Sequence, residues 1–177
     1  MKKLLIMFIA FSSFGIFAQT TAKDYYIIGL SKFALKDYNG AIADYNKSIL
    51  INPNALVYND RGISKNYLED YEGAIADITK AILLDLNYAD AYYNRGIIKK
   101  KLKDYNGAIV DYTKAIVLSP KTRMYNNRGL SKYALKDYKG SILDYTKAIV
   151  LDLNNIDAYY NRGLSKYALK DYKGSIL

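Results

Sequence analysis

The chain has 177 residues, a net charge of +9 and 51% hydrophobic residues, which is typical of a folded globular protein. It contains no histidine and no cysteine, which excludes a Ser-His-Asp triad, a cysteine nucleophile, a disulfide and a Cys/His zinc site. The length allows one domain or one array of repeats, and the counts that need an explanation are the positive charge and the 20 tyrosines.

The first 18 residues have the pattern of a secretory signal peptide. Lys2 and Lys3 form a short positive segment, residues 4–17 are mostly apolar, and Ala18 is a plausible cleavage point. A retained membrane anchor is the alternative, but this apolar run spans only about 21 Å as a helix, less than a bilayer core of about 30 Å. We therefore expect a mature chain without a membrane span, exported to the periplasm, the cell envelope or the exterior.

The remainder of the chain is an internal repeat. Residues 127–143 recur unchanged as residues 161–177. Five glycines mark the register with spacings of 33 or 34 residues: Gly29, Gly62, Gly96, Gly129 and Gly163. A period of this length predicts a solenoid or a related repeat architecture. The predicted array covers 22–177, as repeats 22–54, 55–88, 89–121 and 122–155 and a partial repeat 156–177.

Each repeat contains two helical patterns. In the first repeat, one pattern comprises Tyr25, Ile28, Gly29, Lys32 and Leu35, and the other comprises Ala41, Ile42, Tyr45, Ser48 and Ile49. An aspartate precedes the second pattern in every repeat and is expected to cap its N-terminus: Asp37, Asp70, Asp104, Asp137 and Asp171. A glycine follows each of these three residues later, and close approach of two helices would explain it. Neither helix has enough apolar surface to be stable alone, so the repeats must stack.

The repeat resembles the tetratricopeptide repeat (TPR). Its opening aromatic residues are Tyr25, Tyr58, Tyr92, Tyr125 and Tyr159. Its small residues in the second helix are Ala41, Ala74, Ala108, Ser141 and Ser175, and the next aromatic residues are Tyr45, Tyr112 and Tyr145, with Ile78 in the second repeat. Pro53 and Pro120 end two of the repeats. The resemblance implies an all-α, right-handed superhelical solenoid of antiparallel helix-turn-helix repeats.

Two columns depart from the family pattern by placing cations where apolar residues are usual. One column is Arg61, Arg95, Arg128 and Arg162, with Ile28 in the first repeat, and the other is Lys32, Lys65, Lys99, Lys132 and Lys166. Their aliphatic stems can pack while the charged heads reach outward. We expect the arginines to pair with acids of the second helices, namely Asp44, Asp77, Asp111 and Asp144. The alternative is that these charges are simply solvated.

The inner wall of such a superhelix is built from the first helices and is the candidate binding surface. In TPR proteins this face usually binds an extended peptide or a partner helix. The candidate groove residues are Tyr26, Leu30, Phe33, Asn59, Ile63, Asn66, Tyr93, Ile97, Lys100, Lys101, Asn126, Leu130, Tyr133, Tyr160, Leu164 and Tyr167. The alternative is that some of them only contact the next repeat.

The middle position of this wall is leucine or isoleucine in every repeat: Leu30, Ile63, Ile97, Leu130 and Leu164. Such apolar residues argue against a clamp for a charged C-terminal carboxylate. Lys100 and Lys101 form the one local exception, because an acidic segment of a partner could dock on them; a solvated helix face is the alternative. We expect a protein or peptide partner and no nucleic acid, since the periodic cations and acids balance. The sequence predicts no particular oligomeric state.

We expect no enzyme activity, no catalytic residues, no metal and no cofactor, because no phosphate-binding loop occurs and every repeated aspartate has a structural role available. The expected function is an exported, non-catalytic protein-protein interaction scaffold. The alternative is the N-terminal docking or sensory TPR segment of a longer exported enzyme or signalling receptor, since the last repeat is partial and has no capping helix.

Overall fold

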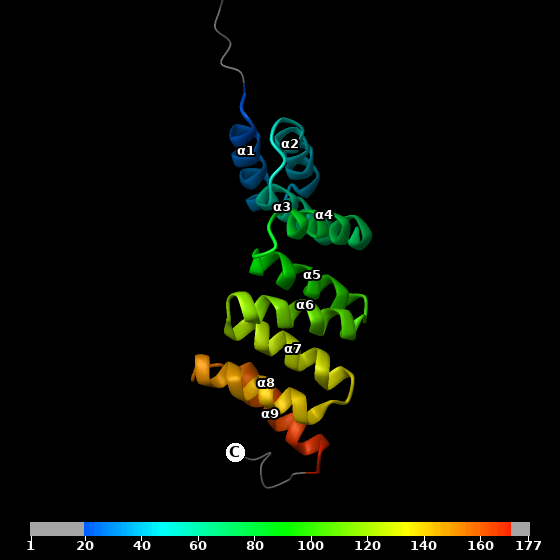
Figure 1. The fold of residues 1–177 in the computed structure, drawn as a ribbon, viewed down its shortest axis with the longest axis vertical. Helices are drawn as coiled ribbons and strands as arrows, with labels where there is room; N and C mark the ends of the chain where they lie inside the picture. Colours follow the sequence, from blue (N-terminus) through cyan, green and yellow to red (C-terminus); the bar gives the residue numbers. More distant parts are fainter. Residues whose placement is uncertain (1–19, 171–177) are drawn as a thin grey trace, which may run out of the picture.

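A computed structural model describes residues 20–170, which fold into nine α-helices. The helices are α1 (Ala22–Ala34), α2 (Tyr38–Ile51), α3 (Ala55–Tyr67), α4 (Tyr71–Leu84), α5 (Ala89–Lys101), α6 (Tyr105–Leu118), α7 (Thr122–Ala134), α8 (Tyr138–Leu151) and α9 (Ile156–Ala168). They follow one another along the long axis of the molecule, from α1 at one end to α9 at the other (Figure 1). The predicted all-α repeat solenoid is confirmed. The predicted signal peptide, residues 1–18, lies outside the described residues.

The odd-numbered helices form the inner layer of the array. Each helix packs on the next along the chain, and α3 also contacts α5, α5 contacts α7, and α7 contacts α9. No comparable contact joins two even-numbered helices within residues 20–170. The even-numbered helices are therefore splayed apart on the outer side. None of the nine helices combines the length and the apolar composition that crossing a bilayer requires.

An aspartate caps the N-terminus of every even-numbered helix, as predicted. The Asp37 carboxylate accepts a hydrogen bond from the Gly40 N–H at 2.9 Å, and Asp70, Asp104 and Asp137 repeat this contact. A Cβ atom on Gly40 would lie 2.0 Å from the Asp37 carboxylate oxygen. The expectation that helix–helix approach requires this glycine is therefore wrong, because the capping carboxylate itself fills the space.

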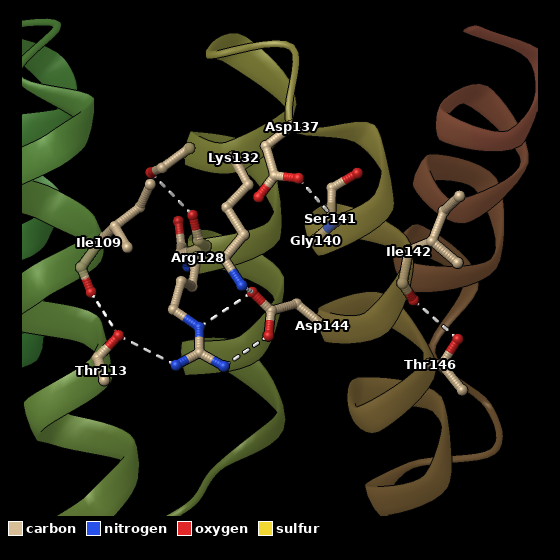
Figure 2. A network of polar contacts seen from close by, with 12 residues as sticks. Ile109, Thr113, Arg128, Lys132, Asp137, Gly140, Ser141, Ile142, Asp144 and Thr146 are labelled. Carbon is tan, nitrogen blue, oxygen red and sulfur yellow. Dashed lines mark hydrogen bonds and ion pairs between the residues drawn. The ribbon is translucent and has the colours of Figure 1, made fainter. Parts of the chain in front are cut away.

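The predicted arginine–aspartate pairing is confirmed in three repeats, and it also joins neighbouring repeats. Arg128 donates from Nε and Nη2 to the two oxygens of Asp144, at 2.9 and 2.6 Å (Figure 2). Its Nη1 donates to the Thr113 hydroxyl of α6 at 3.0 Å, so one guanidinium links α6, α7 and α8. Lys132 adds a second cation to Asp144 at 2.8 Å. The pairs Arg61–Asp77 and Arg95–Asp111 have the same geometry.

In the first repeat, lysines instead of an arginine balance the charge of the buried aspartate. Ile28 stands in the arginine column, and the buried Asp44 is bound by Lys32 and Lys47 instead. Asp44 therefore departs from the predicted arginine pairing, although its charge is still balanced by cations. These hydrogen bonds, first the one from Lys32, lower the pKa of the Asp44 carboxyl.

The turn inside each repeat contains a residue with a positive φ angle that is not glycine. The five residues are Lys36, Glu69, Lys103, Lys136 and Lys170, with φ between 61° and 63°. At the end of α7, the N–H of Lys136 donates to the Tyr133 carbonyl, and the N–H of Asp137 donates to the Lys132 carbonyl. This is a Schellman motif, in which glycine usually occupies the left-handed position.

Replacing Lys136 with glycine is expected to raise the free energy of unfolding by about 0.5–1 kcal/mol, because glycine adopts positive φ without the steric cost that a Cβ atom brings. Urea denaturation measures the change. The matched control is Lys147→Gly in the middle of α8, where the same substitution should lower the free energy of unfolding by about 1 kcal/mol. Equal losses in both variants would contradict the prediction.

Candidate binding groove

Two open cavities adjoin on the inner wall over the first three repeats. The first cavity is lined by Leu30 and Phe33 of α1, Tyr45 of α2, and Asp60 and Ile63 of α3. The second cavity is lined by Ile63, Asn66, Tyr67, Ile78, Asn94, Ile97, Ile98 and Lys101. Because Ile63 lines both, the two cavities form one groove that runs across α1, α3 and α5.

The structure brings together six of the predicted groove residues in these cavities: Leu30, Phe33, Ile63, Asn66, Ile97 and Lys101. Three more line a separate open hollow on α9, namely Tyr160, Leu164 and Tyr167. On α7, Leu130 is partly exposed and the Tyr133 ring packs edge-on against Tyr138 at 5.2 Å. Nine of the predicted residues thus lie at two places, six in the groove over the first three repeats and three in the hollow on α9.

The first column of predicted groove residues serves contacts between repeats. The Tyr26 hydroxyl donates to Asp60 Oδ2 at 2.8 Å, which joins α1 to α3. Asn94 donates to Asn59 Oδ1 at 3.0 Å, and Asn127 Nδ2 donates to the Tyr93 hydroxyl at 3.1 Å. In each of these bonds, a first-column residue of one inner helix pairs with a residue of the next inner helix. That partner stands one position after the first column along the chain.

For two residues of that column, the prediction that they bind a partner is wrong. Asn59 is only 3% exposed and Tyr93 only 8% exposed, so neither presents a free side chain to a partner. The reason is the contact of each inner helix with the next, which closes over the column. Asn126 is half-buried, and its Nδ2 donates to Asn155 Oδ1 at 3.3 Å. The alternative interpretation, packing against the next repeat, holds for these positions.

The two predicted lysines reach towards neighbouring repeats from the end of α5. Lys100 is half-buried, donates to Asn127 Oδ1 at 2.5 Å, and has its pKa lowered by burial. Lys101 donates to Asn66 Oδ1 at 3.1 Å and lies 5.6 Å from the centre of the Tyr71 ring. Lys101 therefore forms part of the groove wall, with its charge at the edge of the second cavity.

Asp60 is a groove residue that the sequence pattern did not identify. Its Oδ2 accepts from Tyr26 and its Oδ1 accepts from Asn59 Nδ2 at 3.0 Å. No lysine or arginine of residues 20–170 forms an ion pair with it, and burial raises the pKa of its carboxyl. The same position in the other repeats holds Ile27, Asn94, Asn127 and Asn161, so the acid is a singular feature of the second repeat.

The raised pKa of Asp60 gives a pH dependence of stability. A folded-state pKa above the unfolded value means that ionised Asp60 destabilises the fold above the folded pKa, and that protonation relieves this as pH falls. As pH falls from neutral to the unfolded pKa of about 3.9, the free energy of unfolding of the wild type should therefore rise relative to that of Asp60→Asn. The titratable groups that sense its charge are Tyr26, Tyr45 and Tyr88, none of them a cation.

Urea denaturation of both proteins across this pH range, with carboxyl NMR of Asp60, measures the effect. Asp85→Asn, in an exposed turn, is the control and should show no such pH-dependent difference. A carboxyl pKa of Asp60 at or below about 3.9 would contradict the prediction.

Comparison with known proteins places the chain by its repeats. Residues 24–54 and 89–121 match family models described as tetratricopeptide repeat, and residues 129–170 match one described as TPR repeat. A crystal structure of MamA protein is 25% identical with a TM-score of 0.82, covering 88% of this chain and 86% of that one. MamA from Desulfovibrio magneticus RS-1 is 22% identical with a TM-score of 0.81, covering 88% and 89%.

A third solved structure contains a ligand. The first TPR of Spaghetti (RPAP3), bound to the HSP90 peptide SRMEEVD, is 27% identical with a TM-score of 0.64, covering 66% of this chain and 93% of that one. A search among proteins of curated function gave no match. The matched segments together span more than half of the chain.

Proposed function

Because this chain belongs to the tetratricopeptide repeat family, we propose that it is an exported, non-catalytic scaffold whose inner groove binds a peptide or helix of a partner protein. The observation that carries this proposal is the groove itself, two adjoining cavities that share Ile63. The peptide seen on the structurally similar TPR of Spaghetti supports it.

The chemistry of the groove suits an extended peptide whose side chains bury aliphatic surface. Leu30, Ile63 and Ile97 provide apolar walls at regular intervals, one from each inner helix. Asn66 and Asn94 line the second cavity and carry amide groups that both donate and accept hydrogen bonds, as a peptide backbone requires. This combination favours recognition of alternating side chains over recognition of a charged terminus.

Ile63→Lys tests the groove because it places a charge where the two cavities meet. A pull-down with the wild-type chain from envelope extract should enrich a defined protein, and Ile63→Lys should lose it. The matched control is Val117→Lys on the outer helix α6, where the side chain is already largely exposed and binding should persist. If Val117→Lys lost the partner and Ile63→Lys retained it, the partner would bind the outer face and not the groove.

Export has its own test. The whole chain, expressed with residues 1–18 in the native host, should be recovered outside the cytoplasm with an N-terminus at Gln19 or close to it. Deletion of residues 2–17 should leave the protein in the cytoplasm. Recovery of the intact chain with Met1 in the cytoplasm would show that this part of the proposal is wrong.

A further inference from the structure

We propose that the first cavity is a specificity pocket for one cationic side chain, lysine or arginine, of the bound partner. The inference rests on the proposed function, since it names what one part of the groove recognises. It depends on three features of the cavity: an unbalanced acid, an unpartnered hydroxyl and apolar walls of suitable chemistry. Each is considered in turn.

The acid is Asp60. Six carboxylates of residues 20–170 are buried or half-buried, and the other five each bind two cations: Asp44, Asp77, Asp90, Asp111 and Asp144. Asp60 has only the neutral donors Tyr26 and Asn59, which fix the direction of its oxygens. A half-buried carboxylate without a counter-ion is costly, so a cation that enters the cavity recovers that cost.

The hydroxyl is that of Tyr45, which lines the same cavity. The Tyr45 side chain is fully buried, and its OH has no hydrogen-bond partner among the described residues. Burial and, after it, the Asp60 charge raise the pKa of Tyr45, and both residues line this cavity. An ammonium or guanidinium group carries several N–H donors, so it can satisfy Asp60 and the hydroxyl oxygen of Tyr45 together.

The walls suit the stem of a long cationic side chain. Leu30 and Ile63 present aliphatic surface, against which the methylene groups of lysine or arginine pack while the charged head continues to Asp60. Phe33 adds an aromatic ring that attracts a cation. An acidic side chain would be repelled, and an apolar one would leave Asp60 desolvated without a partner, so the cavity discriminates by charge.

The chain itself provides a matched substitution. Asparagine occupies the place of Asp60 in the third, fourth and fifth repeats, as Asn94, Asn127 and Asn161. Asp60→Asn therefore removes the charge while inserting a side chain that this fold already accommodates. Loss of binding in this variant then reports on the charge, and circular dichroism verifies that the variant is folded.

The first test uses peptides selected on the full wild-type chain from a random display library. We expect the selected peptides to share one lysine or arginine, and its replacement by norleucine to weaken binding to wild type about tenfold or more. On Asp60→Asn the same replacement should have less than about a threefold effect, while the exposed-turn control Asp85→Asn behaves as wild type. An equal effect on wild type and Asp60→Asn overturns the pocket but leaves the peptide groove standing.

The second test examines the cavity without any peptide. Nα-acetyl-lysine methylamide, which keeps its charged side-chain ammonium group, should shift the carboxyl carbon resonance of Asp60 and lower the pKa of that carboxyl. The norleucine analogue should do neither. If no peptide is selected but this shift is seen, the proposed function fails and the pocket stands. If the lysine amide leaves the Asp60 resonance unchanged, the pocket is overturned.

Discussion

Asp111→Ala is expected to lower the free energy of unfolding by about 3–5 kcal/mol, because it leaves two cations without their partner inside the array. Asp111 is 2% exposed, and its oxygens bind Arg95 at 2.7 Å and Lys99 at 2.8 Å. Arg95 also bonds the Thr79 hydroxyl of the preceding repeat at 3.1 Å, so its position is shared by two repeats. Urea denaturation followed by circular dichroism measures the loss.

A double-mutant cycle separates the pair from the individual side chains. The cycle on Arg95→Ala and Asp111→Ala should show a coupling free energy above about 1 kcal/mol, as for contacting groups in one network. The control cycle on Arg123 and Asp90, whose side chains are 51% and 40% exposed, should show less than about 1 kcal/mol. Absence of coupling between Arg95 and Asp111 would restore the interpretation that these charges are solvated.

The repetition of the sequence made the fold predictable. Each periodic signal, such as the capping Asp104 or the pair Arg95 and Asp111, occurs several times in one register, and a chance match would not recur. The caps and the arginine pairs depend on spacing along one helix or between two adjacent helices. Helical geometry fixes such spacing, so residue positions alone were sufficient.

The turn lysines illustrate what spacing cannot show. Lys136 has φ of 63°, but lysine and glutamate carry no signal for a left-handed position, where glycine or asparagine is expected. The conformation follows from the two hydrogen bonds that end α7, which only the structure reveals. The sequence placed the turn correctly and left its backbone geometry undetermined.

The sequence predicts which residues lie on the inner wall but not how deeply each of them is buried. Helical periodicity assigns Asn59 and Tyr93 to the inner face, yet their burial depends on how closely α3, α5 and α7 approach one another. Asp60 was missed for a related reason, because it stands one residue beyond the column that the periodicity selected. A comparison of its column across repeats, where asparagine is usual, is the signal that would have found it.

Gly96→Ala is expected to destabilise the array by about 1–3 kcal/mol, although alanine is the better helix former. A Cβ atom on Gly96 would lie 2.7 Å from the Tyr112 ring, and that ring is fully buried and cannot move away. Gly107→Ala in the same repeat is the contrast. There the Cβ atom meets the exposed Asp104 carboxylate at 2.1 Å, which can rotate outward. The loss of the cap, about 1 kcal/mol, then roughly offsets the gain in helix propensity.

The sign of the Gly96 effect should reverse when the ring is removed. Tyr112→Ala alone should cost about 3–5 kcal/mol through the cavity that it opens. In that background Gly96→Ala should be favourable by up to about 1 kcal/mol, since the methyl group enters empty space and helix propensity improves. Urea denaturation of the four proteins in this cycle measures both values. A loss of equal size in both backgrounds would mean that the glycine is needed by the backbone of α5 and not by the packing of α5 on α6.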